Sequence, residues 1–330
     1  MPARKFFFAL VVLLTASLAL VPVVALRYPA MAYYDGEYPA WMEEKDALRA
    51  PDAAAAAPAV LFLGDSVMKA SVMPEVLGTG AVNLALGGGT PIEMHYALTE
   101  YLGHHGAPRA VFVGFSPVHY TEAEQFDKRA LYFHYLPWRE GLTARLRMLS
   151  LDGVPWYLWG SLLAEDASYM LRLPTKYWRT MLGSGFARGE ENRRVYDEVR
   201  AARGHMLFER VPDWTEKGFP YYTPGEPFSP LPSLDWYLRD LIRICRARGI
   251  EVHILRLPLE PLLADAYEES GYLAAVDAYL SRVAREEDAT LEAAQRVYGA
   301  EVFGDSLHPN AEGARRYSRE LLEEYREVFP

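Results

Sequence analysis

The chain has 330 residues, which is long enough to bury a full core as one large domain or as a domain with an insertion. Its apolar share of 51% and charged share of 24% are those of a globular protein and exclude a disordered chain. The formal net charge of -10 argues against a nucleic-acid ligand, because phosphates are bound by basic side chains that neutralise them.

An uncharged apolar run over 6–26 opens the sequence and is long enough to cross a bilayer as a helix. Arg4 and Lys5 precede it, so the positive-inside rule places the N-terminus in the cytoplasm and the rest of the chain outside. The alternative is a cleaved signal peptide, for which residues 23–25 are a poor cleavage site. The length of the run favours an uncleaved membrane anchor over 1–28, with secretion after cleavage as the alternative.

A polar, aromatic stretch over 29–57 follows, and we predict that it links the anchor to a domain spanning 58–330. The alanine-rich segment 51–58 is typical of such a linker. Within the domain, residues 118–232 separate two core elements and hold five of the seven tryptophans. A connection of this length is rarely a bare loop, so we predict a large, mostly helical insertion that covers the site.

Short apolar runs that end in turn residues recur from residue 59 on, and each is typical of a strand buried on both faces. They are AVLFLGDS (59–66), AVNLALGGGT (81–90), RAVFVGFSP (109–117) and IEVHILRLPL (250–259). A weaker apolar piece follows near 289–303. Helical patterns stand between the strands, at 91–103, 233–248 and 262–286, and a last helix begins at Ala311 with Asn310 as its N-cap. This alternation predicts a three-layer α/β/α fold with a parallel sheet.

Turn residues follow three of the predicted strands at the same end, as the triplets GDS, GGG and GFS. In parallel α/β sheets, ligands bind beyond the carboxyl ends of the strands. Three distant pieces of sequence are therefore expected to meet at one edge of the sheet.

Two serines follow an aspartate, Ser66 near the beginning of the domain and Ser306 near its end. A serine hydroxyl becomes a nucleophile when a histidine takes its proton, and a carboxylate orients that histidine. Asp305 and His308 lie three residues apart in one short loop, a spacing at which the carboxylate can reach the imidazole. Ser306 stands between them and lacks a buried strand before it. We therefore predict that Ser66, His308 and Asp305 form a catalytic triad.

These motifs resemble the SGNH (GDSL-type) hydrolase superfamily. The family's first block, which carries the nucleophile, matches Gly64-Asp65-Ser66, and its late block matches Asp305 and His308. The letters GDSL at 304–307 fall inside the late block and match the family's name by coincidence. The resemblance implies a flavodoxin-like sheet and ester hydrolysis or acyl transfer, with neither metal nor organic cofactor.

The resemblance also implies an oxyanion hole made of the Ser66 N–H, a glycine N–H, best assigned to Gly87, and a residue after the third strand. The family usually has asparagine at that place, whereas this chain has Ser116, whose hydroxyl could donate instead. With this departure and the anchor, the chain resembles a branch of membrane-anchored, extracytoplasmic proteins that move acyl groups onto cell-envelope polymers, as in teichoic-acid D-alanylation and alginate O-acetylation. That branch implies a membrane-bound partner that exports acyl groups.

Two functions remain open from the residues alone. The first is an extracytoplasmic esterase or O-acyltransferase that acts on acyl esters, with acetyl foremost, of cell-envelope glycans. The second is a non-catalytic SGNH-like protein that binds glycans or assists assembly. The triad favours the first function, and Ser116 in place of asparagine favours the second.

For most of the other candidate residues, we expect a structural role and not a catalytic one. Asp65 is expected to cap a turn, Cys245 to be a buried thiol that forms no intrachain disulfide, and His253 to be packed inside a strand. His104 and His105 lack partners at metal-ligand spacing, so no metal site is expected there. The roles of two further residues stay open. His119 could line the pocket, and Arg256 could reach the site or pair with a carboxylate of the insertion.

Overall fold

The computed structural model describes residues 3–27, 37–50, 60–123, 126–172, 188–208 and 227–329. The predicted linker segment 51–58 lies outside these residues. The chain divides into two compact units, one made of 1–39 and 124–195 and the other of 40–123 and 196–330. The second unit holds the sheet and both predicted halves of the catalytic site.

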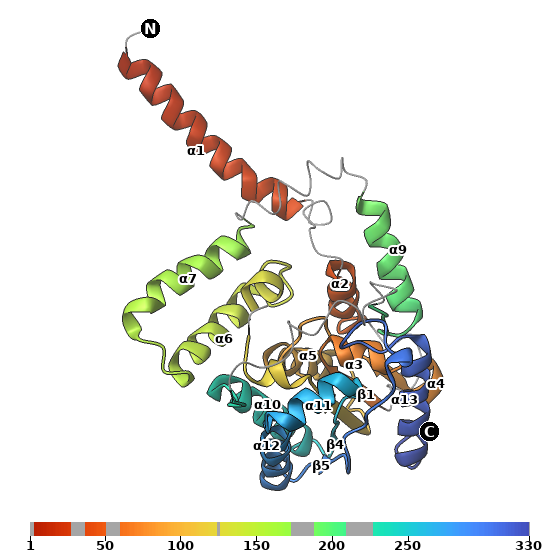
Figure 1. Cartoon of the computed structure of the whole chain (residues 1–330). Coiled ribbons are helices and arrows are strands. Elements are labelled where there is room, and N and C mark those ends of the chain that lie inside the picture. The colour runs from red at the N-terminus through yellow and green to blue at the C-terminus, as the bar shows by residue number, and fades with distance from the viewer. Residues whose placement is uncertain are drawn as a thin grey trace. The chain divides into compact units, whose positions relative to one another are not determined.

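A parallel five-stranded sheet forms the centre of the second unit (Figure 1). Its strands are β1 (Val60–Gly64), β2 (Ala81–Asn83), β3 (Ala110–Gly114), β4 (Glu251–Ile254) and β5 (Thr290–Leu291). They lie in the order β2-β1-β3-β4-β5, which is the order of flavodoxin-like sheets. The prediction of an α/β fold with a parallel sheet is confirmed.

Aromatic side chains stack along one face of the sheet. The register places Phe62 of β1 beside Phe112 of β3, and Phe112 beside His253 of β4. The rings of Phe62 and Phe112 are 5.0 Å apart, and the imidazole of His253 stacks on Phe112 at 4.6 Å. Tyr325 and Phe329, from the end of the chain, cover this row. His253 is therefore the packed residue that its strand position predicts.

Two groups of helices accompany the sheet, as a three-layer fold requires. One group contains α5 (Pro91–His104), α10 (Pro232–Arg246) and α12 (Tyr272–Glu287), and the other contains α3 (Ser66–Ser71), α4 (Pro74–Leu77) and α13 (Ala311–Glu324). Shorter elements of this unit are η2 (Pro117–Tyr120), α11 (Pro261–Glu269) and η5 (Ala300–Val302). Cys245 of α10 is free and buried as predicted, and burial raises the pKa of its thiol to about 12.

The prediction of a single helix over 262–286 is wrong, because two helices, α11 and α12, occupy this stretch. Gly271 lies between the two helices with φ of 69°, in the left-handed region that glycine adopts without steric cost. The apolar pattern continues across this turn, so periodicity alone did not reveal it.

Part of the stretch predicted to be a linker over 29–57 is helical, as α2 (Tyr38–Ala47). Trp41 of this helix is fully buried, and its indole N–H donates to the carbonyl oxygen of Gly87 at 3.2 Å. The segment therefore contributes to the core next to one of the predicted site residues.

The first unit is helical in its described residues. It contains α1 (Ala3–Arg27), the π-helical turn η3 (Phe126–Leu131), α6 (Trp138–Leu151) and α7 (Trp156–Met170). Arg145 of α6 forms a two-bond ion pair with Asp166 of α7, at 2.7 Å for each bond. The chain passes between the two units within α2, between residues 123 and 124, and within α9 (Arg188–Ala201). The last two of these boundaries divide the predicted insertion 118–232 between the units. That the insertion covers the site stays a prediction.

Within the part of the chain that the structure describes, no helix has the length and apolarity needed to cross a membrane.

Candidate active site

The turn between β1 and α3 carries Ser66 at the carboxyl edge of the sheet. Strand β1 ends at Gly64, and Ser66 is the first residue of α3. A side chain at Gly64 would overlap the carbonyl oxygen of Gly114, the last residue of the neighbouring β3. Glycine at position 64 therefore permits the close approach of two strand ends beside the nucleophile.

The structure brings the three predicted triad residues together from opposite ends of the domain. Nε2 of His308 lies 2.8 Å from Oγ of Ser66, and Nδ1 of His308 lies 2.8 Å from Oδ2 of Asp305. Ser66 and His308 are both buried, with less than a tenth of each residue exposed. The arrangement is a serine, imidazole and carboxylate joined in series by hydrogen bonds.

The loop around Asp305 is held by its own carboxylate. Oδ1 of Asp305 accepts hydrogen bonds from the backbone N–H groups of Leu307 at 2.8 Å and His308 at 2.7 Å. The ring of His308 stacks on Phe208, with ring centres 4.7 Å apart. These contacts fix the orientation of the imidazole. Its Nε2 bonds to Ser66, so the serine placed as the nucleophile is Ser66 and not Ser306.

The charge of Asp305 determines which nitrogen of His308 carries the proton. Burial would by itself raise the pKa of this carboxyl, but the hydrogen bonds from His308 and from the backbone outweigh it and lower the pKa. An ionised carboxylate only accepts hydrogen bonds, so Nδ1 of His308 must donate. In the neutral imidazole Nε2 then has a free lone pair, which is the acceptor that the Ser66 hydroxyl needs.

The glycine turn after β2 lies against the same strand end. The N–H of Leu86 donates to the carbonyl oxygen of Gly64 at 3.0 Å, and the indole N–H of Trp41 donates to the carbonyl oxygen of Gly87. Gly88 has φ of 68°, a left-handed conformation that reverses the chain here. The turn that contains Gly87 is thus fixed beside the strand that leads to Ser66.

Ser116 follows β3 and is buried, with 3% of the residue exposed. Its backbone N–H donates to Oδ2 of Asp65 at 2.6 Å. Its hydroxyl makes no well-aligned hydrogen bond to any residue that the structure describes, although it lies close enough to Asp65 to help lower the pKa of that carboxyl. A buried hydroxyl that no well-aligned hydrogen bond holds can turn its donor toward an oxygen that develops negative charge.

Asp65 has more partners than sequence reasoning assigned to it. The predicted cap is confirmed, because Oδ1 accepts from the N–H groups of Val67 at 3.0 Å and Met68 at 3.3 Å. The second oxygen accepts from Ser116 and also from Nδ1 of His119 at 2.6 Å. A histidine shortly after a strand end was the only signal in the sequence for this last contact.

A lysine one helical turn after the nucleophile also escaped the sequence reasoning. Lys69 is fully buried, and its Nζ donates to the carbonyl oxygen of Ala85 at 2.9 Å. Ala85 precedes the glycine turn, so the ammonium group ties α3 to that turn. The base within reach of Ser66 is His308.

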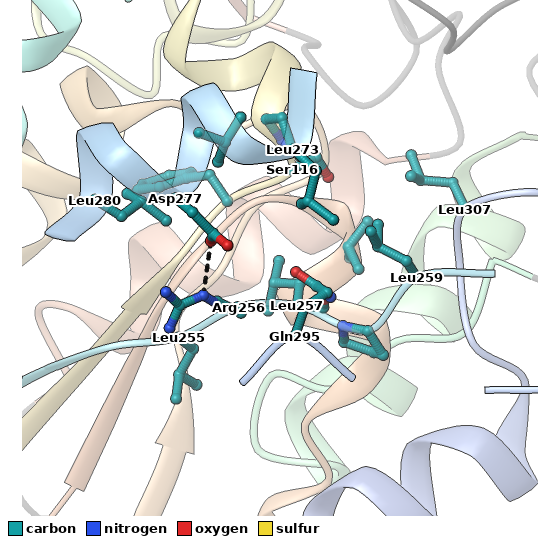
Figure 2. Close-up of a pocket in the computed structure, with 15 residues that line it drawn as sticks. Ser116, Leu255, Arg256, Leu257, Leu259, Leu273, Asp277, Leu280, Gln295 and Leu307 are labelled. Atoms are coloured by element: carbon teal, nitrogen blue, oxygen red, sulfur yellow. Dashed lines mark hydrogen bonds and ion pairs between the residues drawn. The ribbon is translucent and has the colours of Figure 1, made fainter. Parts of the chain in front are cut away.

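A narrow, mostly apolar pocket adjoins the site (Figure 2). Val67 and Leu307, which line it, are the neighbours in sequence of Ser66 and His308. Its other walls come from Ser116, from residues 255–259 after β4, and from α12, through Leu273, Val276, Asp277 and Leu280.

Arg256 lies in the wall of this pocket and is neutralised there. Its Nε donates to Oδ1 of Asp277 at 2.9 Å, as the dashed line in Figure 2 shows. Asp277 belongs to α12, so among the described residues Arg256 pairs with a carboxylate outside the predicted insertion. The pocket is therefore lined mostly by apolar side chains, with Ser116, Gln295 and a neutralised ion pair as its polar groups.

Among the residues that the structure describes, no group of three or more His, Cys, Asp or Glu side chains is arranged to bind a metal ion. His104 and His105, which stand next to each other in the sequence, each bond through one ring nitrogen to a backbone carbonyl, that of Glu100 and of Leu48.

Comparison with known proteins adds little to this geometry. No family model matches the chain, and no curated protein matches it. A crystal structure of a "putative acylhydrolase" from Bacteroides fragilis is similar over 85% of this chain and 92% of that one, with a TM-score of 0.37 and 9% identity. A likeness at this level carries no argument about the fold or the activity, so the function must be argued from the site.

Proposed function

We propose that this protein is a serine-dependent acyl-ester hydrolase or O-acyltransferase of the SGNH type. The observation that carries the proposal is the hydrogen-bonded series from Ser66 through His308 to Asp305. Each side chain has the hydrogen-bond partner that nucleophilic catalysis needs: the serine faces one nitrogen of the imidazole, and the carboxylate faces the other. The motifs around Ser66 and His308, and the strand order, support assignment to that superfamily.

The reaction would proceed in two steps through an acyl-enzyme. Nε2 of His308 takes the proton of Ser66 while Oγ attacks the carbonyl carbon of the ester. The bond to the leaving oxygen then breaks, and His308 gives its proton to that oxygen. In the second step water or a sugar hydroxyl gives its proton to His308 and attacks the acyl carbon. Ser66 leaves and regains its proton.

The negative charge on the ester oxygen would be stabilised by three donors. They are the backbone N–H of Ser66, the backbone N–H of Gly87 and the hydroxyl of Ser116. Support comes from the buried Ser116 hydroxyl, which makes no well-aligned hydrogen bond to the described residues, and from the fixed glycine turn beside β1. The apolar pocket next to Val67 and Leu307 suits the hydrocarbon part of a short acyl group such as acetyl.

The proposed setting is the cell envelope. The predicted anchor over 1–28 would hold the domain at the outer side of the cytoplasmic membrane, facing acylated glycans. A membrane-bound protein that exports acyl groups is the partner that this setting implies. These points rest on the sequence pattern and on Ser116 in place of asparagine.

Labelling with a fluorophosphonate tests the nucleophile. We expect one label per chain, located on Ser66 by peptide mass spectrometry and absent from Ser66→Ala. Ser306→Ala is the matched control, because it removes the other serine that follows an aspartate, and it should label like the wild type. Equal labelling of the wild type and Ser66→Ala would reject catalysis and favour a non-catalytic role in glycan binding or assembly.

Ser116→Ala tests the oxyanion donor. The variant removes the hydroxyl and keeps the backbone N–H that donates to Asp65. Loss of one oxyanion donor lowers kcat about 100-fold in a preorganised site, so we expect a loss of that order in the hydrolysis of p-nitrophenyl acetate. Ser306→Ala again serves as the control. Activity within twofold of the wild type would remove Ser116 from the proposed hole.

A further inference from the structure

A second imidazole–carboxylate pair lies next to the nucleophile. Nδ1 of His119 is 2.6 Å from Oδ2 of Asp65, and Asp65 directly precedes Ser66. The pair repeats the arrangement of His308 with Asp305, but its carboxylate is fully buried. None of the steps proposed above uses His119.

The carboxylate of Asp65 joins two of the three segments that would form the oxyanion hole. One oxygen accepts the N–H groups of Val67 and Met68, in the turn that carries Ser66. The other oxygen accepts the N–H of Ser116 and the imidazole of His119, both in the segment after β3. The position of this carboxylate therefore sets the distance between the Ser66 turn and the Ser116 loop.

A buried carboxylate keeps its charge only when donors compensate for the lost water. Burial would raise the pKa of Asp65, but the hydrogen bond and charge of His119, with the bond from Ser116, lower it overall. His119 itself is partly exposed, with 18% of its side chain accessible. It can therefore supply a strong donor at a smaller desolvation cost than a second buried group would.

We propose that His119 is a positioning residue for acyl transfer, which holds the Asp65 carboxylate through its Nδ1–H and so keeps the Ser66 turn and the Ser116 loop aligned on one ester oxygen. This inference rests on the proposed function and deepens it. The role belongs to Nδ1. The rival role would belong to Nε2, the outer nitrogen of the ring, in direct contact with substrate.

Two substitutions separate these roles, because amide side chains can replace one ring nitrogen at a time. The side-chain nitrogen of asparagine can take the place of Nδ1, whereas that of glutamine reaches the place of Nε2. We would measure the rate of fluorophosphonate labelling of Ser66 in the full-length wild type, His119→Asn, His119→Gln and His119→Ala. Each rate would be normalised to the folded fraction. His104, an exposed histidine of α5, gives the matched control series.

We expect the Ala and Gln variants to label about 100-fold more slowly than the wild type, since a displacement of about 1 Å at a catalytic centre costs that much. His119→Asn should recover most of the rate, and the His104 series should not change it. If His119→Ala does not fold, the comparison of Asn with Gln decides alone.

Three results would overturn the inference. Recovery by Gln and loss with Asn would assign the role to Nε2 and direct contact. Wild-type rates in all three variants would leave His119 without a role in labelling. A wild type that labels no faster than Ser66→Ala would reject the proposed function, and the positioning role with it; that outcome is recognised from the Ser66 control before any His119 variant is compared.

Discussion

Asp305→Asn is expected to lower kcat for p-nitrophenyl acetate about 10,000-fold, the size of effect seen when the orienting carboxylate of a serine triad becomes an amide. The amide keeps an oxygen that can accept the N–H groups of Leu307 and His308, so the loop should retain its shape. It removes the charge that keeps the proton on Nδ1 of His308. If the amide donates to Nδ1 instead, the proton moves to Nε2, which can then no longer accept from Ser66.

The measurement is steady-state hydrolysis, with thermal unfolding to show that the variant is folded. Asp197→Asn, at an exposed position of α9, is the matched control and should leave kcat unchanged. A value of kcat above a tenth of the wild type would contradict the role of Asp305 in orienting His308. His308→Ala should reduce kcat at least as much, because it removes the base itself.

Gly64→Ala is expected to lower the stability of the sheet unit strongly. The added methyl group would overlap the carbonyl oxygen of Gly114 and lie 2.7 Å from Cβ of Met68. The first obstacle is backbone of the neighbouring strand, which cannot rotate away as a flexible side chain would. Overpacking of this kind costs about 3 kcal/mol, so we expect a clear fall in the free energy of unfolding.

The same substitution would push apart the strand ends that carry Ser66 and Ser116, so labelling of Ser66 should slow in whatever fraction stays folded. Gly103→Ala is the control, because an added methyl group at that position has no neighbour within 4 Å. Chemical denaturation followed by circular dichroism measures both variants. Equal stability of the two would show that the ends of β1 and β3 can separate without cost.

Much of the fold was predictable because its signals are local. A buried parallel strand is a short apolar run that ends in turn residues, and such runs at 59–66, 81–90, 109–117 and 250–259 all correspond to strands. Ser66, Asp305 and His308 were predictable for the same reason, since a strand-end serine and a three-residue Asp–His spacing are visible in the letters. The break at Gly271 was not, because one turn inside a continuous apolar pattern hardly changes its period.

The sequence by itself determined where the four longer strands lie along the chain, which residues form the proposed triad, and that Asp65 caps the turn after β1. Tertiary structure alone decided which side chains meet across loops: Trp41 on Gly87, Arg256 on Asp277, and His119 on Asp65. The physical reason is that hydrophobic periodicity and turn chemistry act between neighbours along the chain. Hydrogen-bond pairing of buried polar groups depends instead on which segments the packed sheet brings within 3 Å of one another.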